Sequence, residues 1–286
     1  MEYSKIKTSC FDLKHTIESA QPLTFHSDYD ASSGFLAYPS RDTIVTLKHA
    51  GDHKEATLTV PERHKAEVAR RFRLSDNMDK VYAYIDTDKS MKEAIDKYHG
   101  MRLTLNDPWE TTLCFIISQY NNVKRIRLIT KNIVNRFGPE VVENGNLVGR
   151  GFPSSSTLAG RPVGDFLKCG AGFRAKYIKA AAKYCTENLN LESLRDKPYE
   201  EVKGELMQIP GVGDKVADCI ALMGYGKLEA FPVDVHVKRA MEKIYFGGRK
   251  QSIDRIQDKA FENWGRMAGY AQQYLFHSSR VGNGKA

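Results

Sequence analysis

The sequence predicts an α+β fold, in which an N-terminal antiparallel β-sheet is followed by a mainly α-helical region. Two observations carry this prediction. Short segments in which β-branched and polar residues alternate are confined to the first 60 residues, as expected for half-buried strands. From Pro61 onward, apolar residues recur with helical spacing. Strands and helices do not alternate along the chain, which argues against a Rossmann fold or an α/β barrel.

The N-terminal part is expected to consist of strands and their connections up to residue 60. Three segments carry the strand signal, at residues 34–38, 43–48 and 56–60. The last two flank the polar sequence Ala50-Gly-Asp-His, so we expect them to pair as a β-hairpin.

Helices are expected over most of the chain after residue 60. Asp107 is a suitable N-cap and Pro108 fits the first helical position, so a long helix begins there and runs to Tyr120. Asn121 and Asn122 end it. The remaining helices are expected at residues 62–72, 80–85, 91–98, 123–137, 173–188, 199–208 and 254–276, with a break near 265–269 and a connector rich in Ser, Gly and Pro at 151–164.

The length of 286 residues corresponds to about two domains, at roughly 150 residues per domain. Hydrophobic residues make up 41% and charged residues 27% of the chain, a composition that excludes collagen, coiled coil and wholesale disorder. We expect an N-terminal sheet domain with trailing helices at residues 1–104 and a helical region at residues 105–286.

Positive charge is unevenly distributed along the chain. The net charge is +8, from 43 Lys and Arg against 35 Asp and Glu. The first 100 residues hold 15 basic and 16 acidic residues, whereas residues 236–286 hold 10 and 4. A neutral N-terminal part followed by a basic remainder is typical of a nucleic-acid-binding face on the second part. Charge alone leaves the identity of the polyanion open.

The cysteines and the N-terminal residues indicate an intracellular protein. The five cysteines form no Cys-x-x-Cys pair, so neither a zinc site nor a four-cysteine iron–sulfur cluster is expected. Reduced, structural thiols are expected instead. The sequence shows neither a signal-peptide core nor a membrane span. We expect no membrane partner, and a cytoplasmic location at the nucleoid in a prokaryote or a nuclear one in a eukaryote.

The most informative segment is a glycine turn between two helices. A helix is expected to end near Ile209, the sequence Pro-Gly-Val-Gly reverses the chain, and a second helix begins near Asp214. Gly211 and Gly213 permit positive φ and a close approach of another backbone. The free N–H groups and the dipole of the second helix point at the same turn, which favours the binding of a phosphate.

A helical hairpin without a ligand is the alternative interpretation of Gly-x-Gly alone. The full string, at about residues 199–224 with its helices, is the helix–hairpin–helix signature and favours sequence-independent DNA binding.

Lys215 is the unusual residue of this motif. It lies in the first turn of the second helix, where a cation opposes the helix dipole. That field, together with burial, is expected to lower its pKa and so to make the amine a usable nucleophile. The alternative is a solvated lysine that contacts phosphate.

Asp234 is a lone carboxylate in the apolar segment Phe231-Pro-Val-Asp-Val. It stands at an expected helix start, so it is suited to be an N-cap. A carboxylate in apolar surroundings near an amine is also suited to stabilise a cationic sugar or to take part in proton transfer from Lys215.

Several separated segments resemble the 8-oxoguanine DNA glycosylase family, within the helix–hairpin–helix DNA glycosylase superfamily. The segments are PGVGDKVADCIALM from Pro210, FPVDVHV from Phe231 and AGYAQQYLF from Ala268, with NDPWE, SQYNNVKRI and GFPS further upstream. They occur in the family's order, and the resemblance runs from about Phe11 to Phe276. It implies a bifunctional enzyme that flips 8-oxoguanine out of duplex DNA, displaces the base with a lysine, and cleaves the backbone by β-elimination from the Schiff base.

The resemblance also implies roles for individual residues. Lys215 matches the nucleophile and Asp234 the catalytic aspartate. Gln272 matches the side chain that recognises the Watson–Crick edge, and Cys219 and Phe276 match the pair that sandwiches the base. The expected base pocket comprises Ala20, Cys219, Met223, Gln272 and Phe276, with the Ala20 carbonyl accepting the N7 proton of 8-oxoguanine. From the residues alone, Cys219 and Phe276 could be ordinary core positions and Gln272 a surface amide.

The implied DNA contacts lie in three places. The hairpin residues and a histidine match phosphate-side positions, a Tyr-Asn-Asn turn fills the gap left by the flipped base, and two arginines contact the orphaned cytosine beside an aromatic wedge. These residues are Gly211, Val212, Gly213 and His236; Tyr120, Asn121 and Asn122; and Arg125, Arg174 and Phe173. The partner implied is damaged double-stranded DNA, bound by a monomer.

Three positions depart from the family pattern. Ala20 stands where glycine is common, and at positive φ an alanine would cost roughly 1 kcal/mol. Tyr120 replaces an asparagine of the eukaryotic enzymes, as in microbial members, and can fill the gap by stacking. Phe173 replaces a tyrosine. The preference for cytosine opposite the lesion therefore stays open.

Two other functions compete with a glycosylase/lyase. In a non-catalytic helix–hairpin–helix DNA-binding protein, Lys215 would only contact phosphate and Asp234 would only cap. A related monofunctional glycosylase for alkylated bases would lack the nucleophilic lysine. The chemistry requires no cofactor and no metal bound by side chains. The family implies that the hairpin carbonyls hold a cation when DNA is bound.

Overall fold

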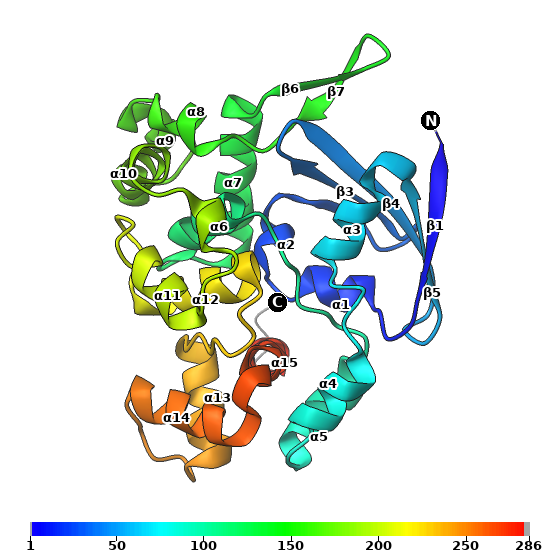
Figure 1. Ribbon diagram of the computed structural model, residues 1–286, viewed down its shortest axis with the longest axis vertical. Coiled ribbons are helices and arrows are strands. Elements are labelled where there is room, and N and C mark those ends of the chain that lie inside the picture. The colour runs from blue at the N-terminus through cyan, green and yellow to red at the C-terminus, as the bar shows by residue number, and fades with distance from the viewer. Residues whose placement is uncertain (1, 283–286) are drawn as a thin grey trace.

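The computed structural model describes residues 2–282, and it confirms the α+β architecture (Figure 1). A five-stranded antiparallel sheet forms one side of the molecule, and a larger helical body forms the other. The strand order is β1-β5-β4-β3-β2. The strands are β1 (Tyr3–Thr8), β2 (Asp28–Asp30), β3 (Phe35–Ser40), β4 (Thr43–Gly51) and β5 (Ala56–Pro61).

The predicted hairpin is present, because β4 and β5 pair antiparallel with Lys48 opposite Thr59. The expectation that the first 60 residues form only strands was wrong. Two short helices, α1 (Leu13–Glu18) and α2 (Pro22–His26), precede β2. Asp12 caps α1 by accepting a hydrogen bond from the His15 amide at 2.8 Å. Each helix has only five or six residues, too few for a periodic pattern to show in the sequence.

The described part of the chain contains thirteen further helices, of which the first, at Lys65–Arg71, packs against the sheet and the others form the helical body. Those that lie near the site are α6 (Pro108–Ser118), α7 (Val123–Phe137), α12 (Asp214–Tyr225), α13 (Val235–Tyr245) and α15 (Ala268–Gly282). The others are α3 (Lys65–Arg71), α4 (Met78–Ile85), α5 (Lys89–Lys97), α8 (Ser155–Ala159), α9 (Val163–Lys168), α10 (Arg174–Glu187), α11 (Tyr199–Leu206) and α14 (Ile253–Trp264), with 3₁₀ turns η1 (Glu62–His64), η2 (Leu191–Leu194) and η3 (Gly265–Met267). The η3 turn lies at the predicted break before α15.

Two local features differ from the expectation. The connector expected at residues 151–164 contains α8, which Ser154 caps by accepting from the Thr157 amide at 3.1 Å. A small hairpin of β6 (Glu140–Glu143) and β7 (Asn146–Arg150) follows α7 and projects at the top of Figure 1.

The buried apolar residues form two clusters. One lies against the sheet and draws on residues 11–72, and the other fills the helical body from residue 78 onward. Phe25 of α2 belongs to the helical cluster, so α2 connects the two parts. Helices α4 and α5 also pack into the helical cluster. In the chain they precede the proposed domain boundary at residues 104–105, so they are among the helices that trail the sheet in the first proposed domain. The outermost residues of the two proposed domains, residue 1 and residues 283–286, lie outside the described residues.

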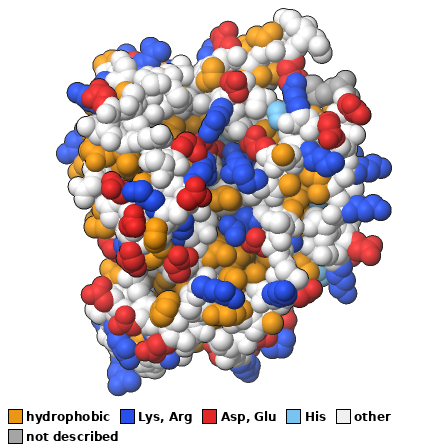
Figure 2. Space-filling view, in the orientation of Figure 1, with side chains coloured by type: hydrophobic (Ala, Val, Ile, Leu, Met, Phe, Trp, Pro, Cys, Tyr) orange, Lys and Arg blue, Asp and Glu red, His pale blue; other side chains and the backbone are white. Residues whose placement is uncertain are grey.

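None of the described helices combines the length and the hydrophobicity that a membrane crossing needs. On the face shown in Figure 2, acidic and basic side chains are intermixed.

Candidate active site

A cavity of about 520 Å³ brings the predicted catalytic and base-pocket residues together. It lies where the end of α6, the start of α7, α12, the segment before α13, α15 and the loop at Ala20 converge. The predicted residues among its lining are Ala20, Asn121, Asn122, Lys215, Cys219, Met223, Asp234, His236, Gln272 and Phe276. Positions spread over more than 250 residues of sequence therefore share one site.

Lys215 is half-buried in the first turn of α12, with its Nζ atom 5.5 Å from the centre of the Phe115 ring. Burial acts to lower its pKa, but the interactions of the ammonium group with Cys219 and with Asp234 outweigh burial and raise the pKa above the usual lysine value. The expectation of a lowered pKa was wrong, because it counted the helix dipole and burial but neither Cys219 one turn along α12 nor Asp234 across the cavity. The amine is therefore protonated in the free protein and must lose a proton before it can attack.

Cys219 lies one turn after Lys215 on α12 and is buried. Burial raises the pKa of its thiol to about 11, against the opposing charge of Lys215. At neutral pH the side chain is therefore an uncharged, polarizable wall of the cavity, as a residue that stacks on a base should be.

Asp234 both caps α13 and lines the cavity. Its Oδ1 accepts hydrogen bonds from the amides of His236 at 2.9 Å and Val237 at 2.8 Å. The two functions considered for this carboxylate are compatible, since one oxygen serves the helix and the side chain still faces the site. The cap fixes its position relative to Lys215.

Gln272 is not a surface amide, since only 5% of the residue is exposed. Its Nε2 donates to the Pro232 carbonyl at 3.0 Å, which connects α15 to the segment carrying Asp234. No donor within the described part of the chain reaches its Oε1, although the atom is buried. A buried acceptor without a partner costs free energy unless a ligand supplies the donor. Phe276, one turn on, lies edge-to-face with His236 at 6.1 Å.

The loop at Ala20 is held by α15. Gln273 donates to the Ser19 carbonyl at 2.9 Å, and Arg280 donates to the Glu18 carbonyl. The next carbonyl in the chain belongs to Ala20, which lines the cavity with φ at +57°. The departure from glycine is thus accommodated by a left-handed alanine.

We expect Ala20→Gly to stabilise the protein by about 0.5–1 kcal/mol. The left-handed conformation costs an L-residue roughly 1–2 kcal/mol, and the greater flexibility of unfolded glycine offsets part of the gain. Urea denaturation of the two proteins measures the difference. A loss of stability would mean that the methyl group's packing outweighs the backbone strain.

The glycine turn reverses the chain between α11 and α12, as the sequence predicts, with a positive φ at Gly211 but not at Gly213. Gly211 has φ at +88°, and a Cβ there would lie 2.8 Å from the Cβ of Tyr177. Gly213 precedes the first turn of α12 in extended conformation, and a Cβ there would meet no atom within 4 Å among the described residues. Val212 is buried. The amides that open α12 therefore face outward next to a residue without a side chain.

The two glycines should respond differently to alanine. Gly211→Ala should lower the free energy of unfolding by about 2 kcal/mol or more, through strain and the contact with Tyr177. Gly213→Ala should lower it by less than about 1 kcal/mol, yet weaken DNA binding, because its methyl group would stand where a phosphate approaches. Denaturation and fluorescence-anisotropy titrations with duplex DNA would separate the two effects. Equal losses of stability would contradict this assignment.

The cation site implied at the hairpin would use backbone carbonyls, and the described residues contain no cluster of three or more His, Cys, Asp or Glu that could hold a metal. The Gly211 carbonyl already accepts a hydrogen bond from Gln119 at 2.9 Å. A cation bound there would have to share this oxygen through its second lone pair.

Tyr120 itself does not line the cavity, although Asn121 and Asn122 of the same turn do, and Arg174 supports the turn. Tyr120 is 96% exposed, and its ring lies 6.5 Å from that of Phe173, which is half exposed. Arg174 is buried and donates to the Gln119 and Tyr120 carbonyls, the latter at 2.9 Å. Arg125, in contrast, is exposed. In this structure Arg174 therefore shapes the turn and does not present a free guanidinium.

The neighbouring asparagines serve the ends of two helices. Asn122 caps α7 by accepting from the Arg125 amide at 3.0 Å, and Asn121 donates to the Ile117 carbonyl at 3.0 Å. These bonds explain why the predicted break between α6 and α7 falls here.

Sequence patterns missed several residues that line the cavity. Phe25, Phe115, Lys124 and Arg280 were not predicted there. The sequence could have indicated Arg280, because Gln272, Phe276 and Arg280 follow one another at intervals of four residues along α15 and so lie on the same face of the helix. No pattern in the sequence indicated Phe25, because its position in the cavity wall depends on how α2 packs against the helical body.

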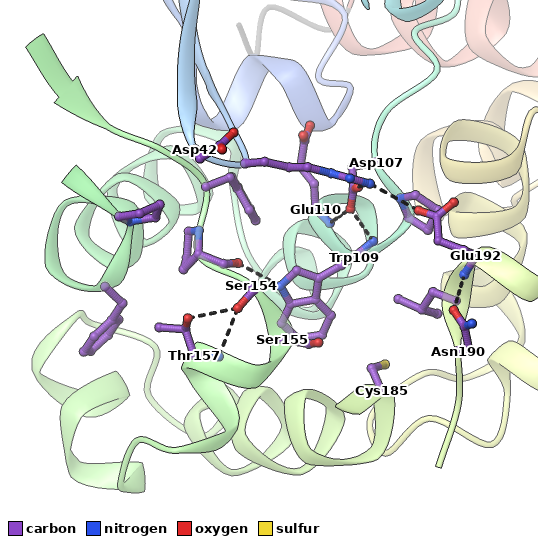
Figure 3. A pocket seen from close by; sticks show the side chains of 17 residues that line it. Asp42, Asp107, Trp109, Glu110, Ser154, Ser155, Thr157, Cys185, Asn190 and Glu192 are labelled. Atoms are coloured by element: carbon purple, nitrogen blue, oxygen red, sulfur yellow. Dashed lines mark hydrogen bonds and ion pairs between the residues drawn. The ribbon is translucent and has the colours of Figure 1, made fainter. Parts of the chain in front are cut away.

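A second, larger cavity of about 750 Å³ lies at the other end of α6. Trp109 contributes to its wall, and Asp107 and Glu192 stand at its edge (Figure 3), where Arg41 bridges them at 3.2 and 3.3 Å. None of the residues predicted to act in catalysis or DNA binding lines it. Size alone therefore does not identify the reaction site.

Comparison with known proteins gives consistent matches along the chain. The family described as HhH-GPD superfamily base excision DNA repair protein matches residues 113–266, and the N-terminal domain of 8-oxoguanine DNA glycosylase matches residues 4–112. A Saccharomyces cerevisiae protein named N-glycosylase/DNA lyase is 31% identical over 254 residues, which cover 76% of this chain and 67% of the relative. A probable N-glycosylase/DNA lyase of Methanothermobacter thermautotrophicus is 31% identical over 229 residues, or 73% and 72% of the two chains.

A solved structure extends the similarity to nearly the whole chain. It is the Clostridium acetobutylicum 8-oxoguanine glycosylase/lyase in complex with double-stranded DNA containing cytosine opposite 8-oxoguanine. The TM-score is 0.86 at 29% identity, and the match covers 99% of this chain and 100% of the other.

Proposed function

The chain belongs to the helix–hairpin–helix superfamily of base excision DNA repair proteins and carries the N-terminal domain of 8-oxoguanine DNA glycosylases, and from this premise we propose its reaction. The protein excises 8-oxoguanine from duplex DNA through a lysine Schiff base and cleaves the resulting abasic site by β-elimination. The observation that carries the proposal is the convergence of Lys215, Asp234 and the unpaired amide oxygen of Gln272 on one cavity.

DNA is bound through its backbone and the lesion through its base. The amides at Gly211–Gly213 and the start of α12 hold a phosphate, and the exposed ring of Tyr120 takes the place of the flipped nucleotide. Inside the cavity, the Gln272 oxygen accepts hydrogen bonds from the Watson–Crick edge. The carbonyl of Ala20 accepts the N7 proton, which guanine itself lacks. All these groups come from one chain, which supports a monomer as the active unit.

The covalent steps use Lys215 and Asp234. After losing a proton, the Lys215 amine attacks C1′, the bond to N9 breaks with its electron pair on the base, and the proton lost by the amine ends on the departing base. The Asp234 carboxylate stabilises the positive charge that develops on the sugar. The C1′–O4′ bond then breaks as the lysine nitrogen forms a double bond to C1′, and a proton from that nitrogen ends on O4′, which gives a protonated Schiff base. Loss of a C2′ proton expels the 3′ phosphate, and hydrolysis frees Lys215.

Borohydride trapping tests the proposal. The protein is incubated with duplexes containing 8-oxoguanine, 7-methylguanine or guanine, and borohydride reduces any Schiff base to a stable adduct. We expect an adduct and strand cleavage with 8-oxoguanine alone. Binding without excision would favour the non-catalytic alternative, and excision of 7-methylguanine without an adduct would favour an alkylated-base glycosylase.

A further inference from the structure

Arg280 is a buried cation without a carboxylate partner. Only 9% of the residue is exposed, and its guanidinium forms no salt bridge within the described part of the chain. The exposed Glu18 carboxylate acts on it from beyond ion-pair distance and offsets part of the effect of burial on its pKa. One nitrogen donates to the Glu18 carbonyl, and its buried Nε has no hydrogen-bond partner. Burial lowers its pKa, but the group stays charged. An unpaired buried charge is costly, so it calls for a ligand that supplies the missing partner.

The Arg280 side chain contributes to the wall of the base cavity. Arg280 lines it together with Gln272 and Phe276, and the three residues extend over about 12 Å of one face of α15. Its Cζ lies 6.0 Å from the centre of the Phe276 ring. Its bond to Glu18 places it beside the loop of Ala20, where the N7 side of a bound purine is expected.

The charge of Arg280 is not offset within the cavity. The charged residues of the lining are Lys124, Lys215, Asp234 and Arg280. Lys215 and Asp234 oppose each other, and Lys124 is exposed, so water screens its charge. Arg280 therefore gives the interior of the cavity a net positive potential, which a low-dielectric site strengthens.

We propose that Arg280 selects oxidised over alkylated purines by the charge that the base carries as it leaves. This inference rests on the proposed function. When C1′–N9 breaks, a neutral oxidised purine takes the electron pair and carries negative charge until it gains a proton, so a nearby guanidinium stabilises its departure. An N7-alkylated purine is cationic in DNA and leaves as a neutral base, so the same guanidinium repels it when it enters the cavity.

The test measures single-turnover excision of 8-oxoguanine and of 7-methylguanine at saturating protein. Arg280→Gln keeps a donor for the Glu18 carbonyl and removes the charge. We expect it to slow 8-oxoguanine excision by about 10- to 100-fold and to shift the ratio of the two rates toward 7-methylguanine by at least about 10-fold. Arg280→Lys, which keeps the charge, should restore the wild-type ratio. Arg266→Gln removes the same charge from an exposed position and should leave the ratio unchanged.

Nicking of a preformed abasic site is the internal control, since no base leaves in that reaction. It should be unchanged in Arg280→Gln. If Arg280→Gln has lost nicking because it is misfolded, Arg280→Met takes its place in the same comparison. Methionine keeps an unbranched side chain packed against Phe276 but carries no charge. Equal slowing of both lesions, or no change in either, would overturn the proposal. Absence of 8-oxoguanine excision by the wild-type protein would instead contradict the proposed function.

Discussion

Lys215→Gln should abolish the borohydride-trapped adduct and slow 8-oxoguanine excision by at least about 10³-fold. The amide keeps a polar side chain in the first turn of α12 but cannot form a Schiff base. The raised pKa of Lys215 means that the charged side chain interacts favourably with its neighbours in the folded protein, so its loss should lower the free energy of unfolding slightly, while duplex binding should persist. Single-turnover kinetics, trapping and anisotropy titration on the same lesion duplex measure the three quantities.

Lys124→Gln is the matched control for this variant. Lys124 is a second amine in the lining of the same cavity, but it is exposed at the start of α7. At saturating protein, Lys124→Gln should retain the adduct and the excision rate. If the adduct survives in Lys215→Gln and disappears in Lys124→Gln, the nucleophile is Lys124 on α7, and the assignment of Lys215 is wrong.

The hairpin could be predicted from the sequence because its geometry is local. Pro210 to Gly213 specify a reversal by backbone conformation alone, and the observed positive φ of Gly211 follows from that requirement. The Asn144-Gly145 turn between β6 and β7 had an equally local signal. Both residues have positive φ, at 50° and 78°, and Asn-Gly between apolar segments is a strong hairpin sequence. That hairpin was missed although the sequence contains it.

The electrostatics of the site could not be predicted in the same way. Burial acts on the pKa of Lys215 in the expected direction, and the opposing effect of Cys219 comes from the same helix. The charge of Asp234, however, comes from another helix, and its effect depends on a distance that no spacing in the sequence determines. The same holds for Arg174, whose burial beneath the Tyr120 turn depends on how α10 packs against the end of α6.

Asp234→Asn should slow base excision by about 10²- to 10⁴-fold, while duplex affinity changes by less than about 3-fold. Asparagine is as good an N-cap as aspartate, so the bonds to the His236 and Val237 amides should remain and the fold should lose at most about 1 kcal/mol. The substitution therefore removes the charge that faces Lys215 without removing the cap. Single-turnover excision, binding and urea denaturation test each part.

Asp107→Asn is the matched control, because it makes the same substitution at the N-cap of another helix. Asp107 accepts from the amides of Trp109 at 2.9 Å and Glu110 at 3.2 Å, in the same pattern as Asp234, but at the end of α6 remote from the base cavity. Its variant should retain full excision. If Asp234→Asn lost binding, stability and excision together, the carboxylate would be a helix cap alone. A selective loss of excision requires its charge to act on the reacting sugar, because the cap is the same in both variants.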